Sequence, residues 1–449
     1  MPFNKILVAN RGEIAVRVMR ACREMGIRTV AVYSSADADS MHVQYANEAV
    51  CIGPSDKTKS YLSLSNIIGA ADITNAEAIH PGTGFLAEAP HFAEACRDHG
   101  ITFIGPTPEN IEMMGDKSKA RQLMAKAGIE PIPGSKGVSR NEKEALKTAH
   151  KLVYPVVVKA SAGGGGIGIR EAYNDAGLVN VFQLVQGEAS AAFGRSEVYI
   201  EKLVERAKHI EFQILADKYG NVVCLGEREC SIQRRKQKLI EESPCIAITQ
   251  KIREDMIKSL LKAIKSIKYT NVGTVEFLMD AEGKFYFMEM NTRIQVEHTV
   301  TEMVTGLDLV KEQIHLAAGE KLGFRQGDIN FSGHAIECRI NAEDPDKKFM
   351  PFPGTIDNFQ TPGGPGIRLD THIYNGYKIP PFYDSLIAKL ITHGKDRNEA
   401  IARMRRALDE IVISGIKTTI PFHKKIMEDE RFLRGDIYTN FLNSFNVSE

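Results

Sequence analysis

The sequence predicts an α/β protein, α+β overall, that opens with a parallel sheet and contains more than one domain. The first observation is length, because 449 residues exceed the size at which one hydrophobic core keeps growing. The second is a βαβ pattern at the start, where apolar strands at 5–9 and 29–33 flank an amphipathic helix over 13–25. The third is a later antiparallel hairpin, predicted from β-patterned runs at 274–280 and 285–290.

The first domain is expected to hold a single open parallel sheet. Further strands at 78–80 and 102–104 fit this sheet, and the Gly-Pro-Thr-Pro stretch at 105–108 marks its end. The first turn, Asn10-Arg11-Gly12, has only one glycine, which is too few for a dinucleotide-binding loop. We therefore predict a structural role for this turn.

The remainder of the chain is expected to form a larger second domain with an inserted subdomain, followed by a C-terminal unit. A helix is predicted over 116–127, and the Pro/Gly-rich stretch 131–137 reads as a hinge into the subdomain. A strand at 334–340 and an amphipathic helix over 397–412 belong to the C-terminal unit. The predicted bounds are 1–113, 114–330 with the subdomain at 131–203, and 331–449.

A glycine loop at Gly163–Gly166 lies between two β-patterned runs. Its glycines let backbone N–H groups approach phosphate oxygens closely, and Lys159 brings a positive charge to the same place. The loop is neither a dinucleotide fingerprint, which must open a helix, nor a Walker loop, which needs a closing Gly-Lys-Ser/Thr. The pattern favours a mobile flap over phosphates, and a merely flexible loop is the alternative.

Two glutamates in the predicted hairpin are candidate metal ligands. With a four-residue turn at 281–284, Glu276 pairs across the ladder with Glu289, and Asn291 follows on the same face. Facing carboxylates repel and raise each other's pKa unless a cation lies between them. Two carboxylates and an amide oxygen suit Mg²⁺ or Mn²⁺. A solvated strand face with two unrelated acids is the alternative.

Arg293, Gln295 and Glu297 follow at period two, which places them on one side of an extended segment. A guanidinium offers a fork of donors to a small planar oxyanion such as bicarbonate, and a glutamate can act as the general base. A surface ion pair is the alternative interpretation.

The chain resembles biotin carboxylase, a member of the ATP-grasp superfamily and the first half-reaction component of acetyl-CoA carboxylase and related enzymes. Seven ordered motifs carry the resemblance nearly end to end: KILVANRGEIAVRV from Lys5, MGDKSKAR from Met114, KASAGGGG from Lys159, EKLVERAKHIEFQ from Glu201, SIQRRKQK from Ser231, FMEMNTRIQVEH from Phe287 and HAIECRINAED from His334.

The resemblance implies an ATP-grasp fold with a glycine-rich flap and a C-terminal α+β domain. It implies two Mg²⁺ or Mn²⁺ ions bound by Glu276, Glu289 and Asn291, which agrees with the strand-pairing prediction. The implied ATP-binding residues are Lys117, Lys159, Gly165, Gly166, Glu201, Lys202, Leu203, Val204, His209, Gln233, Lys236, Glu276 and Glu289.

The same resemblance implies the chemistry. Bicarbonate is expected at Lys238, Arg293, Gln295 and Val296, with Glu297 as the base that deprotonates it. The oxyanion attacks the γ-phosphorus of ATP to give carboxyphosphate, which breaks down to CO₂ and phosphate. Phosphate then takes the proton from biotin, while Arg339 stabilises the resulting enolate oxygen. The expected catalytic residues are Lys238, Arg293, Glu297 and Arg339.

Four positions depart from the pattern of the family. Lys236 stands where histidine is common, and both are cationic donors to phosphate. Thr83 occupies a position near biotin that is usually aromatic, which bears on the affinity for free biotin. Thr299 replaces a proline, and Ile167 a basic flap residue.

Composition excludes several other classes. With 57 basic against 57 acidic residues, no long-range field favours nucleic acid or an anionic membrane. No apolar run of about 18 residues and no leader are seen, so a soluble, cytoplasmic protein is expected. The seven cysteines are odd in number and lack a C-x-x-C pair, so we predict free thiols rather than disulfides or a zinc site.

Partners are also implied by the resemblance. No Met-Lys-Met biotin-attachment sequence occurs in the chain, so we expect a separate biotin carboxyl carrier protein, carboxyltransferase subunits and a homodimer. One alternative is the same component in a split pyruvate or propionyl-CoA carboxylase, which would share these residues. A non-catalytic ATP-binding module and a generic ATP-grasp ligase are less favoured, because the metal, Arg and base positions are all present.

Overall fold

The computed structural model describes residues 3–135, 137–160, 168–193 and 196–445. Its N-terminal elements form a five-stranded sheet in the order β3-β2-β1-β4-β5, in which every neighbouring pair is parallel. The predicted open parallel sheet is thereby confirmed. The strands are β1 (Lys5–Val8), β2 (Arg28–Ser34), β3 (Glu48–Gly53), β4 (Ala78–His80) and β5 (Thr102–Phe103).

Both faces of this sheet are covered, as is usual for parallel strands. Ile6 and Val8 of β1 pack in one apolar cluster with the first helix, whereas Leu7 packs in a second cluster on the other face. The helices of this region are α1 (Gly12–Glu24), α2 (Met41–Tyr45), α3 (Leu64–Thr74), α4 (Pro90–Asp98) and α5 (Pro108–Gly115).

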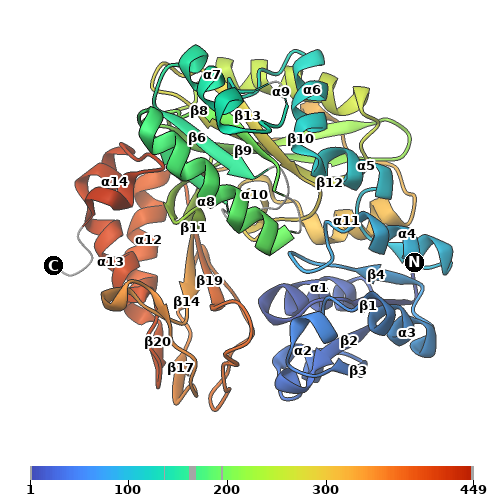
Figure 1. Cartoon of the computed structure of the whole chain (residues 1–449). Helices are drawn as coiled ribbons and strands as arrows, with labels where there is room; N and C mark the ends of the chain where they lie inside the picture. The colour runs from blue at the N-terminus through green and yellow to red at the C-terminus, as the bar shows by residue number, and fades with distance from the viewer. Residues whose placement is uncertain (1–2, 136, 161–167, 194–195, 446–449) are drawn as a thin grey trace.

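A single antiparallel sheet of eight strands forms the body of the molecule, in the order β13-β12-β9-β10-β11-β14-β19-β18 (Figure 1). Strand β11 pairs with β14, so strands from the last third of the chain extend the sheet built by the middle third. The strands are β9 (Lys208–Ala216), β10 (Val222–Arg234), β11 (Gln237–Ser243), β12 (Asn271–Met279), β13 (Phe285–Asn291), β14 (His334–Asn341), β18 (Ile367–Thr371) and β19 (Leu386–Gly394).

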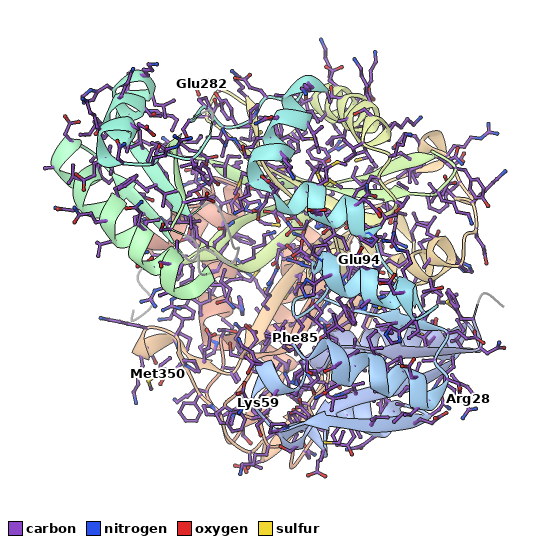
Figure 2. All side chains as sticks on the ribbon, turned by 45° about the vertical axis from the view of Figure 1, so that its right-hand side comes forward. Arg28, Lys59, Phe85, Glu94, Glu282 and Met350 are labelled. Atoms are coloured by element: carbon purple, nitrogen blue, oxygen red, sulfur yellow. The ribbon has the colours of Figure 1, made fainter. Side chains whose placement is uncertain are left out.

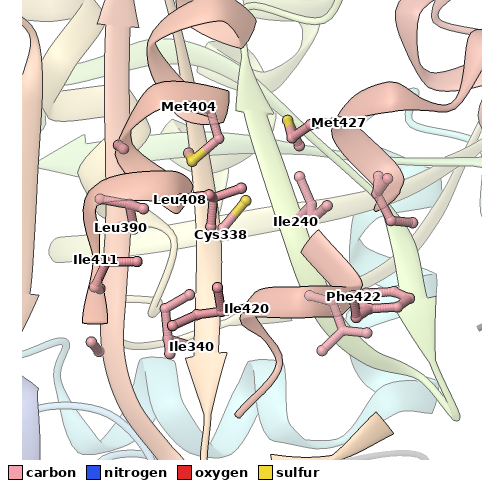
Figure 3. Packing of buried hydrophobic residues seen from close by; sticks show 14 of the residues in the cluster. Ile240, Cys338, Ile340, Leu390, Met404, Leu408, Ile411, Ile420, Phe422 and Met427 are labelled. Atoms are coloured by element: carbon pink, nitrogen blue, oxygen red, sulfur yellow. The ribbon is translucent and has the colours of Figure 1, made fainter. Parts of the chain in front are cut away.

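Helices pack on this sheet along its whole length. Near the C-terminus, Met404 and Leu408 of α12 and Phe422 of α13 share one apolar cluster with Cys338 and Leu390 of the sheet (Figure 3). The helices are α6 (Lys117–Lys126), α9 (Gln250–Ser266), α10 (His298–Thr305), α11 (Leu309–Ala317), α12 (Arg397–Glu410), α13 (Ile420–Glu428) and α14 (Glu430–Arg434).

The helix predicted over 397–412 is two residues too long. Ile411 is extended (φ −70°, ψ 125°), and Val412–Ser414 form β20, which pairs with β17 (Asn358–Gln360). The pairing uses backbone groups that a continued helix would have kept for itself. A second short pair joins β15 (Glu343–Asp344) to β16 (Met350–Pro351).

The inserted subdomain has a sheet and an apolar core of its own. Its strands are ordered β7-β6-β8, and α7 (Glu142–Leu152) and α8 (Asp175–Phe193) contribute to its core (Figure 1, green). The predicted strand–loop–strand is confirmed, because β6 (Val156–Ala160) pairs antiparallel with β7 (Ile169–Ala172), beside β8 (Val198–Lys202). The glycine loop itself, with Gly165, Gly166 and Ile167, lies outside the described residues.

Two absences were expected from composition. All seven cysteines are free thiols, and only Cys51 is exposed. Within the described ranges, no helix combines the length and the apolar character needed to span a bilayer.

Candidate active site

A cavity of about 800 Å³ opens between the end of the large sheet, the subdomain and the N-terminal region. Most of the residues singled out from the sequence line it together, although they come from seven separate segments. Those lining residues are Lys117, Lys159, His209, Gln233, Lys236, Lys238, Glu276, Glu289, Asn291, Arg293, Gln295, Val296, Glu297 and Arg339. Residues 201–204 do not line this cavity; Glu201 reaches it indirectly, through an ion pair with Lys159.

A second cavity, of about 1080 Å³, adjoins the first one between α6 and the described residues of the predicted hinge, 131–135 and 137. Lys117 and Tyr199 line both cavities. The larger cavity is lined by neither of the facing glutamates nor by Lys238, Arg293 or Arg339, so the chemistry belongs to the smaller one.

The predicted pairing of Glu276 with Glu289 is confirmed. It is reached by a different route from the one expected. Next to the turn, Met279 pairs with Phe285, a register that by simple counting would set Glu276 opposite residue 288. A bulge between Glu276 and Phe277 shifts the ladder by one residue and restores the pairing.

Glu276 is buried, and polar groups surround it. Its carboxylate accepts hydrogen bonds from Lys238 at 2.9 Å, Gln295 at 2.6 Å and Asn291 at 2.9 Å, and His209 Nε2 lies 3.1 Å away. Burial raises the pKa of this carboxyl, but Lys238 and His209 outweigh burial and hold the pKa well below its usual value. Glu276 is therefore ionised.

Lys238 is the centre of the charge cluster. Its ammonium donates to Glu211 at 2.5 Å, to Glu276 at 2.9 Å and to Glu297 at 2.7 Å. Burial alone would lower the lysine pKa, yet these three carboxylates raise the pKa well above the usual value. The buried lysine therefore keeps its charge and draws three acids toward one point.

Glu297, the expected base, lies between two cations. It accepts from Lys238 at 2.7 Å and from Arg339 at 2.9 Å, and Arg339 also contacts Glu241 at 2.5 Å. Burial raises the pKa of Glu297, but Lys238 and Arg339 more than offset this and bring the pKa far below its usual value. Glu297 is thus a carboxylate held between two cations.

The expectation of a continuous extended segment through Glu297 is wrong. The chain turns at Val296 and Glu297, and Glu297 immediately precedes helix α10. Gln295 and Glu297 nevertheless line the same cavity as Arg293, because the turn carries the glutamate back toward Lys238. Arg293 donates through Nε to Glu88 at 2.9 Å, and its Nη2 lies 3.3 Å from Asn291 Oδ1.

The opposite wall of the cavity carries two lysines with fewer partners. Lys117, the first residue of α6, lies 3.1 Å from Glu289, and Lys159 of β6 lies 2.5 Å from Glu201. Burial lowers the pKa of Lys117, but Glu289 outweighs burial and raises the pKa above the usual value. Both lysines face the cavity, where they can meet a polyanion.

The donor set fits a divalent cation. Glu276, Glu289 and Asn291 share one cavity edge, and all offer hard oxygen ligands. The ligand atoms of His209, Glu211 and Glu276 also lie within 4.8 Å of one another. Lys238 contacts both Glu211 and Glu276, however, so the ammonium of this lysine already occupies the space beside this second group of ligand atoms.

Four charged residues of this site were missed from the sequence: Glu88, Glu211, Arg228 and Glu241. Arg228 is fully buried and donates to Glu211 at 2.5 Å and to Gln295 at 3.1 Å. Period two from His209 along β9 would have placed Glu211 on the same face. Glu88 carries no comparable signal, because it lies in a loop 205 residues from Arg293, its partner.

Facing glutamates beside buried cations, in a cavity lined in part by an inserted subdomain, are typical of the class of ATP-grasp ligases. Comparison with known proteins agrees. Family models match as Biotin carboxylase, N-terminal domain, at residues 2–111; Carbamoyl-phosphate synthase L chain, ATP binding domain, at 116–325; and Biotin carboxylase C-terminal domain, at 337–444.

Individual relatives cover the chain almost completely. A biotin carboxylase of Nostoc sp. is 58% identical over 99% of this chain and 100% of its own length. A pyruvate carboxylase subunit of Methanothermobacter thermautotrophicus is 56% identical over 99% of this chain and 90% of its own. The biotin carboxylase domain dimer of Hydrogenobacter thermophilus 2-oxoglutarate carboxylase, solved with MgADP, ADP and bicarbonate, has a TM-score of 0.96 and 52% identity, covering 98% of this chain and 97% of that one. The chain belongs to the biotin carboxylase family of ATP-dependent ligases.

Proposed function

We propose that this chain carboxylates biotin on a separate carrier protein, using MgATP and bicarbonate, as the first half-reaction of acetyl-CoA carboxylase. The observation that supports this most directly is the position of Glu297, between Lys238 and Arg339 and in the same cavity as the Glu276–Glu289 pair. A base, a cationic anion site and a metal–nucleotide site are thereby within reach of one another.

Bicarbonate is assigned to Lys238, Arg293, Gln295 and Val296. Arg293 is held by Glu88 and can offer its remaining N–H groups to a planar anion. Gln295 donates to Glu276 and accepts from Arg228, which fixes the orientation of its amide. The anion would therefore enter a site whose donors are already oriented.

Glu297 is assigned as the base that deprotonates bicarbonate. A carboxylate whose pKa lies far below neutral is a weak base. When bicarbonate engages Lys238, that lysine is shared among four anions instead of three, so it stabilises the Glu297 carboxylate less and the pKa of Glu297 rises toward the value that proton transfer needs. The deprotonated anion then attacks the γ-phosphorus of ATP, the bond between that phosphorus and the β,γ-bridging oxygen breaks, and carboxyphosphate forms with ADP as the leaving group.

ATP is assigned to Lys117, Lys159, Glu201, Lys202, Leu203, Val204, His209, Gln233, Lys236, Glu276, Glu289 and the flap amides at Gly165 and Gly166. Mg²⁺ or Mn²⁺, two ions in all, held by Glu276, Glu289 and Asn291, would neutralise charge on the transferred phosphoryl group. Lys117 adds positive charge from the opposite wall. Burial, with Lys117 nearby, lowers the pKa of Lys159 to about 7, and bound phosphates would favour its charged form.

Biotin is assigned to Arg339. When carboxyphosphate decomposes to CO₂ and phosphate, phosphate removes the proton from the ureido nitrogen of biotin, and the guanidinium stabilises the enolate oxygen. The nitrogen then attacks CO₂ to give carboxybiotin. Arg339 is fixed for this by Glu241 and Glu297. Thr83 lies in the loop that precedes Glu88, where a small polar side chain provides less contact area for free biotin than an aromatic ring.

The assembly is proposed from the same family relation. We propose a cytoplasmic homodimer that works with a biotin carboxyl carrier protein and carboxyltransferase subunits. The domain division at 1–113, 114–330 and 331–449, with a mobile flap subdomain at 131–203, is proposed alongside it. A dimer is supported by the Hydrogenobacter thermophilus structure, which contains two copies of the domain.

The decisive experiment measures ADP release from MgATP with and without bicarbonate, and with and without biotin. We expect bicarbonate-dependent release that biotin stimulates. Removing the negative charge in Glu297→Gln should lower the rate by about 10²-fold or more, since general base catalysis typically contributes 10²–10⁴-fold. Arg339→Ala should abolish the stimulation by biotin.

The control variant is Lys262→Gln, on the outer helix α9, which should leave all rates unchanged. A carrier protein should be tried as acceptor alongside free biotin because of Thr83. Rates that are equal with and without either acceptor, or insensitive to both active-site substitutions, would contradict the proposal.

The acceptor of the carboxyl group needs its own assay. A split pyruvate carboxylase is the alternative, and the Methanothermobacter thermautotrophicus relative is part of a pyruvate carboxylase. The final recipient of the carboxyl group, acetyl-CoA or pyruvate, does not enter this active site. The active-site residues therefore do not distinguish acetyl-CoA carboxylase from pyruvate carboxylase. Carboxylated carrier should be offered to acetyl-CoA- and pyruvate-specific carboxyltransferases, and transfer to pyruvate alone would rule out acetyl-CoA carboxylase.

A further inference from the structure

The turn after β1, residues 10–13, of which Gly12 and Glu13 begin α1, lies where the strand order of the parallel sheet reverses. In open parallel sheets, the crevice beyond the strand ends at such a point usually receives a ligand. Here segments of the same chain fill it: Asn10 contacts the backbone of residues 81–83, and His372 lies against Gly12, 3.6 Å from where a Cβ would stand. Among the described residues that line the catalytic cavity, none comes from this turn.

We propose that this turn, Asn10-Arg11-Gly12-Glu13, is a positioning clamp for the active site. Its three polar side chains make separate contacts, and each contact leads to a cavity residue either along the chain or through one further side chain. The inference rests on the proposed function, because it assigns the turn to the bicarbonate and biotin side of that site.

Asn10 holds the first segment, the loop after β4. Its Nδ2 donates to the carbonyls of Pro81 and Thr83, both at 2.7 Å. Gly82 passes so close that a Cβ there would lie 2.8 Å from the asparagine amide. The loop that leads to Glu88, the partner of Arg293, therefore starts from a fixed point.

Arg11 and Tyr61 join this loop to a second segment. The guanidinium forms a bidentate pair with Asp37, at 2.7 and 2.8 Å, and lies 4.4 Å above the ring of Tyr383. Tyr61 donates to Asp37 at 2.6 Å, and its ring stacks on Phe85 at 5.0 Å and meets Tyr383 edge-on at 5.5 Å.

The two rings that contact Tyr61 belong to residues that lie shortly before a cavity residue in the sequence. Phe85 stands three residues before Glu88, and Tyr383 directly before Asp384, which also lines the cavity. Figure 2 shows Phe85 where the N-terminal elements meet the rest of the chain. Tyr61 thus sets the spacing between the loop that carries Glu88 and the loop that carries Asp384.

Glu13 acts on the third segment. It lies 3.2 Å from the ammonium of Lys389, a fully buried lysine of β19, which donates to the carbonyl of Val296 at 2.8 Å. Val296 belongs to the proposed bicarbonate site and precedes the base Glu297. Through Lys389, the clamp therefore helps to fix the turn at Val296 and Glu297, which positions the proposed base.

The test compares KM values for bicarbonate, biotin and MgATP in the full-length enzyme. Arg11→Lys loses the fork and the stacking, and Tyr61→Leu loses the ring pair, so both should raise KM for bicarbonate about tenfold or more. KM for MgATP should stay within about twofold, because Lys117 and Lys159 stand on other elements. Tyr61→Phe keeps both ring contacts and should retain a KM for bicarbonate close to wild type.

The matched control is Ile67→Ala, a buried residue of α3 in the same apolar cluster. It should lower the thermal midpoint without a selective change in KM. Arg11→Lys and Tyr61→Leu proteins that change no KM, or raise all three alike, would overturn the clamp. Wild-type enzyme without bicarbonate-dependent ADP release would overturn the proposed function first, and the clamp with it.

Discussion

The two walls of the catalytic cavity are built in opposite ways. On the sheet wall, Lys238 contacts three carboxylates at 2.5–2.9 Å, and only 12% of its side chain is exposed. On the α6 wall, Lys117 has one carboxylate partner, Glu289 at 3.1 Å, and 19% of the lysine side chain and 31% of the glutamate side chain are exposed. The sheet wall is thus internally compensated and fixed before any ligand binds, whereas the α6 wall keeps cationic charge that a polyphosphate can use.

This difference predicts that removing a charge from the sheet wall lowers the stability of the folded protein as well as its activity. Lys238→Met would leave Glu211, Glu276 and Glu297 without their shared cation, and breaking a buried pair typically costs about 3–5 kcal/mol. We expect that loss in the free energy of unfolding, measured in urea, together with loss of bicarbonate-dependent ADP release.

Lys236→Met, two residues away at an exposed turn, is the matched control for stability. It should change the free energy of unfolding by less than about 0.5 kcal/mol. If Lys238→Met and Lys236→Met destabilised the protein equally, the buried ion pairs of Lys238 would contribute no more to stability than an exposed lysine does.

The same cluster predicts a pH dependence. The pKa values of Glu276 and Glu297 are depressed in the folded protein, so their contribution to stability is fully present above the unfolded value of about 4.3. It is lost as pH falls through the lower folded pKa. The stability difference between wild type and Lys238→Met should therefore be constant from about pH 7 to 5.5 and shrink below about pH 4.3. A difference that stays constant down to pH 3 would contradict this.

The smallest effect on stability is expected at the α6 wall. Lys117→Gln removes a partly exposed ion pair, so the free energy of unfolding should change by less than about 1 kcal/mol. KM for MgATP should rise about tenfold, a loss of about 1.4 kcal/mol in affinity. KM for bicarbonate should stay unchanged, because the bicarbonate site is assigned to the sheet wall. Equal changes in the two KM values would show that the walls do not act separately.

Local sequence patterns predicted elements better than they predicted the contacts between elements. The hairpin and the Glu276–Glu289 pair could be counted along the chain, although the bulge that restores their pairing could not. The period-two rule failed at Glu297, because a turn before α10 replaced the extended segment. Glu88 and Glu241 were missed since their partners, Arg293 and Arg339, are remote in sequence.

The sequence by itself determined the residue types of the site, the family and the opening parallel sheet, because short-range periodicity and ordered motifs survive in one dimension. Only the tertiary structure decided which cation faces which acid, and hence that Lys238 serves three carboxylates at once. Coulombic and hydrogen-bond energies depend on distances of a few ångströms between segments hundreds of residues apart, and no local pattern encodes those distances.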